Sequence, residues 1–504
     1  MRRLAWLASS IIIGIISILV VVFTTIPSND DRLALRYGVY GLILLPPLAL
    51  ASIGLLGLML YVRRSSAYAI TFAITGTVFL LFITLITDIP PFDDQLTVMN
   101  ASIMIRNPRS GILSITRTYM ERFPYQSGLA LYMASYTHVL GATYTAYRVM
   151  QYMNIIPLLA SVAIIGIITR ELSGRLGERS VLTMIIMFPA IPMYCYKVYG
   201  NVLALPFMLS SILACIRLCR HGDTRHQFPV LLASVLMMTW MKPNALIIVI
   251  AIIMVIMGSW GSGSIPMILG VLAMSVMGMM APQAIYGAIT GYDMRDNRQP
   301  SISWVAEGLT SVNNVEGAYN ERFLSGTFDV SSSAARSIAI NGIRDEITGF
   351  TPSSFMGFIT RKMGNTWADP SYDSGVYAYR TMMAWSQCSD SLLPIIKSGL
   401  GLVDGDAYPR LSSTSDYYYH HVYVPMDDYW NDAVQGLVMM LVLIGVMAIR
   451  RGDWPCVLPA LCLAGGFMFH LLWETQPEYG FPYVLICIPY VGIAVDWILS
   501  SHER

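Results

Sequence analysis

The chain has 504 residues, of which 55% are hydrophobic and only 12% are charged. Soluble domains carry about 25% charged residues, so this composition excludes an ordinary soluble protein and indicates one that crosses a membrane many times. The formal net charge is +1, and there is no basic stripe or nucleic-acid-binding motif, so nucleic acid is not an expected partner. The large polar region at 290–431 contains a single cysteine, Cys388, so no disulfide is expected within it.

Many apolar segments are long enough to cross the hydrocarbon core, which takes roughly 17 to 25 residues per helix. They lie near 5–26, 38–62, 67–87, 146–169, 180–199, 202–219, 228–241, 243–258, 265–289, 432–449, 455–473 and 481–499. The first exceeds the apolar part of a signal peptide and no small-residue cleavage site follows it, so we interpret it as a retained helix. Pro243 favours a turn between its two neighbouring segments. The sequence predicts an all-α polytopic membrane protein with about twelve transmembrane helices.

The orientation follows from lysine and arginine, which favour the cytoplasm when they lie in short loops. Such residues occur at 2–3, 63–64, 170–179, 217–225 and 450–451. With about twelve spans, all of these positions fall on one side of the cell (cytoplasmic) membrane, and both termini are cytoplasmic. The regions predicted to lie outside are 27–37, 88–145, 197–201, 290–431 and 473–480.

Two of the external regions are large. In the first, 96–105 is an amphipathic run suited to the membrane interface, and 127–140 is an apolar helix too short to span. Ser102 therefore offers an external position for cysteine labelling. The chain divides into a transmembrane module (1–289) carrying the external loop 88–145, a small external domain (290–431) and C-terminal transmembrane helices (432–504).

An acidic segment follows the third span directly and reads Thr87-Asp88-Ile89-Pro90-Pro91-Phe92-Asp93-Asp94-Gln95. Carboxylates at the edge of a membrane are costly to desolvate, and adjacent ones repel each other, which indicates a function for them. The alternative is that Asp93 and Asp94 only cap the helix that follows, because Asp is a favoured residue at a helix start.

Other polar side chains gather at the outer ends of separate segments, while the middles of the spans have almost no ionisable groups. They are Arg117, Glu121, Arg122, Lys197, Asn201, Lys242, His470 and Glu474. A proton-coupled transporter usually needs paired charges at mid-membrane, so this pattern favours an enzyme with a cleft open to one face. Two alternatives remain open: Lys197 and Lys242 extend toward the interface as ordinary snorkelling lysines, and His470 with Glu474 forms a simple hydrogen-bonded pair.

The order of these segments resembles the GT-C superfamily of membrane glycosyltransferases, which includes protein O-mannosyltransferases and aminoarabinose transferases. The resemblance rests on Pro91-Phe92-Asp93-Asp94, Arg122-Phe123-Pro124-Tyr125-Gln126-Ser127-Gly128, Tyr147-Arg148, Val198-Tyr199-Gly200-Asn201, Pro206-Phe207, Trp304-Val305-Ala306-Glu307-Gly308-Leu309, Phe469-His470-Leu471-Leu472-Trp473-Glu474 and Tyr479-Gly480-Phe481-Pro482-Tyr483. It covers most of the chain as a series of short motifs. Two residues depart from the pattern: Asn201 stands where many members have Asp, and Glu478 where a basic residue often precedes the Tyr.

The resemblance implies a polyprenyl-phosphate sugar as donor and a lipid, glycan or protein as acceptor. No Gly-rich phosphate loop for a nucleotide sugar is present. The resemblance also implies an inverting transfer, in which Asp94, with Asp93 beside it, removes the proton of the acceptor hydroxyl. Lys197, Lys242 and Arg122 are candidates for stabilising the leaving phosphate. The other candidate substrate-binding residues are Tyr125, Gln126, Asn201, His470 and Glu474. No cofactor is expected, and no metal ligands are assigned.

Two other functions fit the composition. A transporter or flippase for lipid-linked sugars would have a similar cleft without chemistry. A non-catalytic scaffold would use the membrane helices only to present the external domain at 290–431.

The first prediction concerns the acidic segment. Replacing Asp93 and Asp94 together by Asn removes both candidate bases, so glycan transfer should be lost while expression and membrane insertion stay intact. The measurement is the cell-envelope glycan profile of cells carrying the variant. Wild-type transfer by the double variant would refute the assignment of the base to this segment.

Overall fold

The computed structural model of the protein describes residues 2–25, 74, 76–77, 91, 93–106, 113–140, 144–188, 190–292, 294, 298–312, 315–328, 330–369, 372, 431–449 and 453–502. The predicted span at 38–62, Asp88 and Cys388 lie outside these residues, as do most of the span at 67–87 and much of the 290–431 region. The described part is helical apart from one antiparallel pair of two-residue strands, β1 (Ser311–Val312) and β2 (Val315–Glu316).

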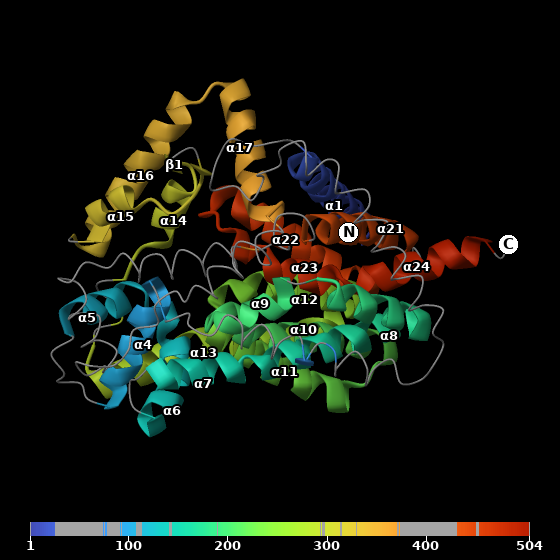
Figure 1. The fold of residues 1–504 in the computed structure, drawn as a ribbon, viewed down its shortest axis with the longest axis horizontal. Coiled ribbons are helices and arrows are strands. Elements are labelled where there is room, and N and C mark those ends of the chain that lie inside the picture. Colours follow the sequence, from blue (N-terminus) through green and yellow to red (C-terminus); the bar gives the residue numbers. More distant parts are fainter. Residues whose placement is uncertain are drawn as a thin grey trace, which may run out of the picture.

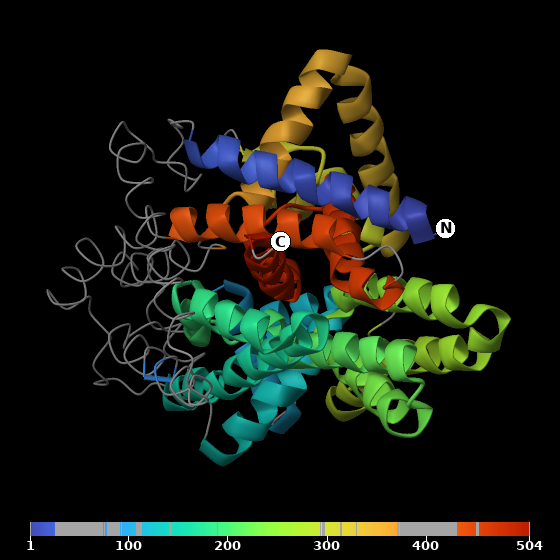
Figure 2. The same cartoon turned by 90° about the vertical axis from the view of Figure 1, so that its right-hand side faces the viewer.

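One group of helices combines the two ends of the chain (Figures 1 and 2). Its members are α1 (Arg2–Thr25), α21 (Asp432–Ala448), η7 (Trp454–Val457), α22 (Leu458–Leu472), η8 (Pro477–Tyr479), α23 (Phe481–Cys487) and α24 (Pro489–His502). Helix α1 packs along α21 and α22. Two polar contacts join α1 to α21: the Ser17 hydroxyl donates to the Met439 carbonyl at 3.1 Å, and the Trp6 indole donates to the Val446 carbonyl at 3.4 Å.

The second group consists of the middle of the chain and lies below the first in Figure 1. Its members are α7 (Tyr144–Met153), α8 (Ile155–Ile186), α9 (Ala190–Met193), η2 (Tyr194–Tyr196), α10 (Gly200–His221), α11 (Thr224–Met241), η3 (Pro243–Ala245), α12 (Leu246–Trp260), η4 (Gly261–Ser264) and α13 (Ile265–Thr290). The two groups meet where α8 packs on α24 and α12 packs on α22. A continuous apolar core, which includes Ile13, Leu209, Ile252 and Ile486, fills the space between them.

The remaining helices form two sets in Figure 1, one at the lower left and one that rises at the top above the first group. They are α4 (Asp93–Arg106), α5 (Leu113–Arg122), η1 (Pro124–Gln126), α6 (Ser127–Leu140), α14 (Ser301–Glu307), α15 (Glu321–Phe328), α16 (Ser332–Gly349) and α17 (Pro352–Trp367). A second core cluster holds α4, α6, α7 and α13 together through buried side chains such as Val98, Met133, Tyr147 and Tyr286. Helix α17 anchors the α14–α17 region to the membrane helices by packing on α1 and α22.

Several helices are long and apolar enough to cross a membrane. Within the described residues, four helical stretches meet this condition: Ala146–Ile186, Gly200–His221, Pro243–Thr290 and Trp454–Leu472. A fifth is formed by Pro477–Cys487 with Pro489–Ser500, bent by 44°, if the pair is one span. The apolar stretches Ala5–Val20 and Ala433–Ala448 are shorter. The chain is therefore an all-α, membrane-spanning protein.

Backbone breaks divide two of these stretches. The stretch Pro243–Thr290 has 48 residues, well beyond the roughly 20 that one crossing requires. It is interrupted at Gly261, whose φ of 59° ends α12, and α12 and α13 then pack against each other. Helix α8 contains a similar break at Gly174, with φ 82°. The region 170–179, predicted as a loop, is thus helical on both sides of one glycine.

Two predicted boundaries differ in the structure, and one is confirmed. The interfacial helix α4 starts at Asp93, so the acidic pair lies within its first turn. The segment 180–199 is not one helix, because α8 ends at Ile186 and the short α9 and η2 follow. The turn expected at Pro243 is present, since α11 ends at Met241 and η3 begins at Pro243. Ser102 is only 1% exposed and is hydrogen-bonded to Thr137, which makes it a poor labelling position.

The second prediction concerns the orientation of the protein in the membrane. Val139, at the end of α6, is 78% exposed, and the His226 side chain at the opposite end of the bundle is 73% exposed. If the arginine-rich ends face the cytoplasm, a membrane-impermeant maleimide should label Val139→Cys in intact cells and His226→Cys only after permeabilisation. The parent chain measures the background from its own cysteines. The reverse pattern would place the α4–α6 end inside the cell.

Candidate active site

Asp94 lies in the first turn of α4 and is half-buried. The Tyr199 hydroxyl donates a hydrogen bond to Asp94 Oδ2 at 3.1 Å. Burial raises the pKa of Asp94, and this effect is opposed by hydrogen bonds from Tyr119 and Tyr199 and by the charges of Lys197 and Lys242. Asp94 is therefore a carboxylate whose basicity is increased by its surroundings. The side chain of Asp93 lies outside the described residues.

Tyr199 links Asp94 to η1. It precedes α10 in an extended conformation, with φ −147° and ψ 163°, which points the chain into the site before the helix begins. The Gln126 side chain, from η1, donates to the Tyr199 hydroxyl at 2.6 Å. Gln126, Tyr199 and Asp94 thus form a chain of hydrogen bonds in which each donor points toward the carboxylate.

Lys242 lies on the other side of Tyr199. Its Nζ is 4.8 Å from the centre of the Tyr199 ring and 5.4 Å from the centre of the Tyr479 ring, so two aromatic faces surround the ammonium group. Burial lowers the pKa of Lys242 to about 7, with a further decrease from Lys197 and an opposing effect of Asp94 and Glu474. A cation with aromatic neighbours keeps its N–H donors available for an anionic ligand.

Close backbone packing brings Lys242 to the start of α10. A Cβ placed on Gly200 would lie 2.5 Å from the Met241 carbonyl oxygen and 3.5 Å from Cδ of Lys242. Only glycine permits this approach, which sets the N-terminus of α10 beside the turn that carries Lys242. Helix N-termini favour negative charge, so the position suits an anion.

A small recess, with a cavity volume of about 20 Å³, lies between these elements. Its walls are formed by Asn201, Met208, Lys242, Asn244, Ile248, His470, Tyr479, Pro482 and Tyr483. The Nδ2 group of Asn201 is buried and, among the described residues, has no hydrogen-bond acceptor. The recess therefore combines an ammonium group, a buried amide donor and a helix N-terminus, which is a set suited to a phosphate. We call it the anion recess.

Glu474 lies in the segment between α22 and η8, beside Tyr479 of the anion recess. It accepts hydrogen bonds from the Tyr479 hydroxyl at 3.1 Å and from the Gln476 side chain at 3.3 Å. Burial raises the pKa of Glu474, and the charge of Asp94 acts in the same direction. His470 stacks on Tyr479 and contacts the backbone carbonyl of Glu474 at 3.4 Å, so it meets the main chain of Glu474 instead of its carboxylate.

Two of the candidate phosphate-binding cations are engaged elsewhere. Lys197 forms a buried ion pair with Glu478, the residue that departs from the GT-C pattern. Arg122 donates to the Thr327 carbonyl at 2.8 Å and to Gln299 Oε1 at 3.3 Å, which ties the end of α5 to α15. Among the three cations predicted to bind phosphate, Lys242 is the one that lines the anion recess.

The structure brings most of the predicted site residues together from distant parts of the chain. Tyr125 lies among the acids, since the charges of Asp94, Glu474 and Glu307 all raise its pKa after the effect of burial. Sequence reasoning did not single out Tyr199, Tyr479 or Glu307 as site residues. All three lie within motifs that resemble GT-C segments, which is the signal that could have identified them.

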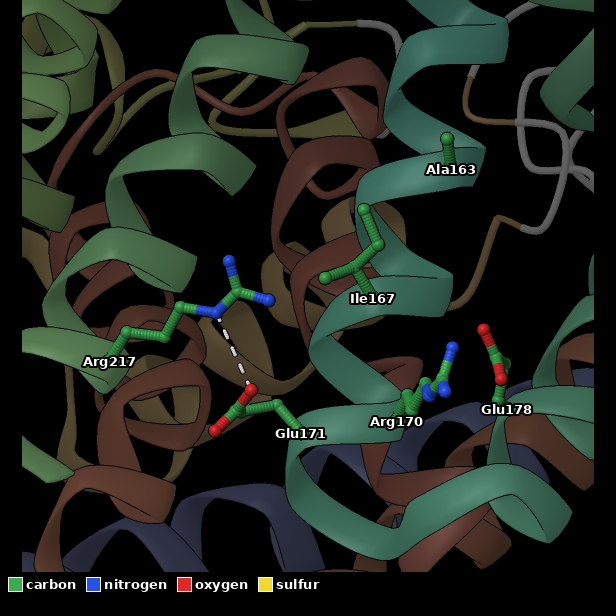
Figure 3. Close-up of a pocket in the computed structure, with 6 residues that line it drawn as sticks. All are labelled: Ala163, Ile167, Arg170, Glu171, Glu178 and Arg217. Atoms are coloured by element: carbon green, nitrogen blue, oxygen red, sulfur yellow. Dashed lines mark hydrogen bonds and ion pairs between the residues drawn. The ribbon is translucent and has the colours of Figure 1, made fainter. Parts of the chain in front are cut away.

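A separate cavity lies at the opposite end of α8 and α10 (Figure 3). Figure 3 shows Ala163, Ile167, Arg170, Glu171, Glu178 and Arg217 around it. Glu171 accepts from Arg217 at 3.4 Å and pairs with His221 at 2.7 Å. Glu171 is therefore paired with basic side chains, whereas Asp94 accepts hydrogen bonds from tyrosines.

Comparison of the chain with protein-family models, with curated proteins and with solved structures gives no match. The interpretation of the site therefore depends on its geometry. In the part of the chain that the structure describes, no group of three or more His, Cys, Asp or Glu is arranged to hold a metal ion.

The third prediction concerns the Lys197–Glu478 pair, whose side chains are 6% and 10% exposed. Removing one partner leaves the other charge buried, so Lys197→Met or Glu478→Gln alone should lower the free energy of unfolding by about 3–5 kcal/mol. The double variant should lose clearly less than the sum of the two, as measured by denaturant unfolding in detergent. Arg117→Met is the control, because its side chain is 55% exposed and its pair with Glu121 should contribute less than about 1 kcal/mol. Additive losses would show that the pair is not coupled.

Proposed function

We propose that this protein is a membrane glycosyltransferase of GT-C type. It transfers a sugar from a polyprenyl-phosphate carrier to a hydroxyl of a lipid, glycan or protein acceptor. The observation that carries the proposal is the placement of a basic carboxylate, Asp94, and an anion recess around Lys242 on the two sides of one tyrosine, Tyr199.

The proposed reaction is a direct displacement at the anomeric carbon. Asp94 takes the proton of the acceptor hydroxyl as that oxygen attacks the carbon. The bond between the carbon and the phosphate oxygen breaks, and the electron pair leaves with the lipid phosphate. Lys242, Asn201 and the N-terminus of α10 stabilise the phosphate as its negative charge grows. Attack and departure on opposite sides invert the anomeric centre.

The residues around this pair have supporting roles in the proposal. Gln126 and Tyr199 orient the Asp94 carboxylate through their hydrogen bonds. Tyr125 and Glu474, together with His470 on the same wall, contact the sugar. Lys197 and Arg122 maintain the site through their own pairings and do not bind phosphate directly.

The membrane placement is part of the same proposal. About twelve spans with both termini in the cytoplasm put α4, the anion recess and the external domain at 290–431 at the outer face of the cytoplasmic membrane. The donor is then drawn from the outer leaflet, where a lipid carrier is available and a nucleotide sugar is not.

A flippase for lipid-linked sugars is the alternative function. It would use the phosphate-binding side of the site and would not need a base. The two functions differ in whether Asp94 is required for a covalent step.

The fourth prediction separates these roles with single substitutions. In proteoliposomes supplied with polyprenyl-phosphate sugars, Asp94→Asn should lower kcat by about 10²–10⁴-fold, because it removes the general base. Lys242→Met should mainly raise KM for the lipid-linked donor, because it removes a charge-assisted contact. Since only ionised Asp94 is a base, wild-type activity should fall as the pH falls through its raised pKa.

Asp345→Asn is the matched control, because Asp345 is exposed on α16, away from the recess. It should transfer sugar at the wild-type rate. Suppose that neither the wild type nor Asp94→Asn transfers sugar, and that both move the donor across the membrane at the same rate. This result would favour the flippase and refute the proposed enzyme.

A further inference from the structure

Glu307 is a buried acid beside the proposed site. It ends α14 and is 0% exposed. Helix α14 is fixed against the chain before Glu474: the Glu474 backbone N–H donates to the Trp304 carbonyl at 3.1 Å, and the rings of Trp304 and Trp473 stack at 6.5 Å. A Cβ on Gly308 would lie 2.4 Å from the Leu472 carbonyl oxygen, so glycine is required for this contact.

The charges around Glu307 come from each neighbouring element. Glu474 follows α22, Tyr125 belongs to η1, and Lys362 belongs to α17. Lys362 is 0% exposed and donates to the Gly308 carbonyl at 2.5 Å and the Leu471 carbonyl at 3.2 Å. The charge of Asp94 raises the pKa of Tyr125 and of Glu474, so Asp94 lies close to both of these neighbours of Glu307.

Burial favours the uncharged form of Glu307. Burial and the neighbouring Glu474 raise the pKa of Glu307 to about 9, whereas burial raises the pKa of Glu474 to about 7. Burial also lowers the pKa of Lys362 to about 7, so this amine does not hold Glu307 in its ionised form. At neutral pH the proton therefore resides on Glu307.

Among the described residues, one of the two carboxyl oxygens of Glu307 has a hydrogen-bond partner and the other has none. Its Oε1 accepts the backbone N–H of Asn320 at 2.5 Å. Its Oε2 is buried and has no hydrogen-bond partner among the residues that the structure describes. A protonated carboxyl group has one O–H donor, and a buried donor needs an acceptor.

We propose that Glu307 is a neutral carboxylic acid whose Oε2–H donates a hydrogen bond to a hydroxyl oxygen of the transferred sugar. This role rests on the proposed glycosyl transfer. It makes Glu307 a residue that recognises the sugar, next to Tyr125 and Glu474, and separate from the base and the anion recess.

The protonation is tested without any activity. A folded-state pKa raised above the unfolded value, about 4.3 for Glu, means that the folded protein binds the extra proton, so stability is lost as the pH rises from that value toward the raised pKa. The Tm of the full chain in detergent should therefore fall more steeply between pH 6 and 9 for the wild type than for Glu307→Gln. The other groups, Asp94, Glu474, Lys362 and Tyr125, are present in both proteins. Asp345→Asn, at an exposed position on α16, is the control and should keep the wild-type slope. Equal slopes for Glu307→Gln and the wild type would overturn the proposal.

The hydrogen bond is tested by transfer from polyprenyl-phosphate sugars in proteoliposomes. Glu307→Gln keeps an N–H donor of the same shape and should retain kcat/KM within about threefold, whereas Glu307→Leu should lose about 10- to 100-fold. A series of donors, each lacking a different sugar hydroxyl, identifies the partner of Glu307. The donor that lacks this partner hydroxyl should be used equally well by the wild type and Glu307→Leu. Equal loss in the Gln and Leu variants would overturn the role of Glu307. Absence of transfer by the wild type would instead refute the proposed function, and the Tm profiles separate the two outcomes.

Discussion

The site depends on the double contact of Tyr199, whose hydroxyl binds the Asp94 carboxylate while its ring faces the Lys242 ammonium. Each charged group loses several kcal/mol of hydration when it is buried, and a direct ion pair is the usual compensation. Here a tyrosine joins the two charges, so neither is neutralised by the other. The carboxylate keeps a lone pair for a proton, and the ammonium keeps donors for an anion.

The packing of the helices serves this arrangement. Gly200 lets the start of α10 lie against the turn at Lys242, and the segment after α22 closes the opposite wall with Glu474 and Tyr479. The Lys197–Glu478 pair joins two buried opposite charges, so each charge has a partner. The anion recess then remains on the other side, where a phosphate meets no carboxylate from this pair.

The asymmetry of the site is what distinguishes the proposed chemistry from transport. The carboxyl groups of Asp94, Glu474 and Glu307 lie near Tyr125, and the donors Lys242 and Asn201 line the anion recess. A displacement needs a base and a stabilised leaving group at opposite ends of one sugar, whereas movement of a lipid phosphate needs only the second. In the cavity at the far end of α8 and α10, by contrast, Glu171 is paired with Arg217 and His221.

The sequence by itself determined the class of fold, because apolar length and helical periodicity are local properties: the interfacial helix α4, the short α6 and the break before Pro243 could all be predicted. It also nominated Asp94, Lys242 and Glu474, since charges are costly in the hydrocarbon and collect at the ends of spans. Only the tertiary structure decided that Lys197 meets Glu478, that Arg122 binds α15 and that Glu307 faces Glu474. These contacts join segments far apart in the chain. They depend on how helices pack, which no local pattern of residues encodes.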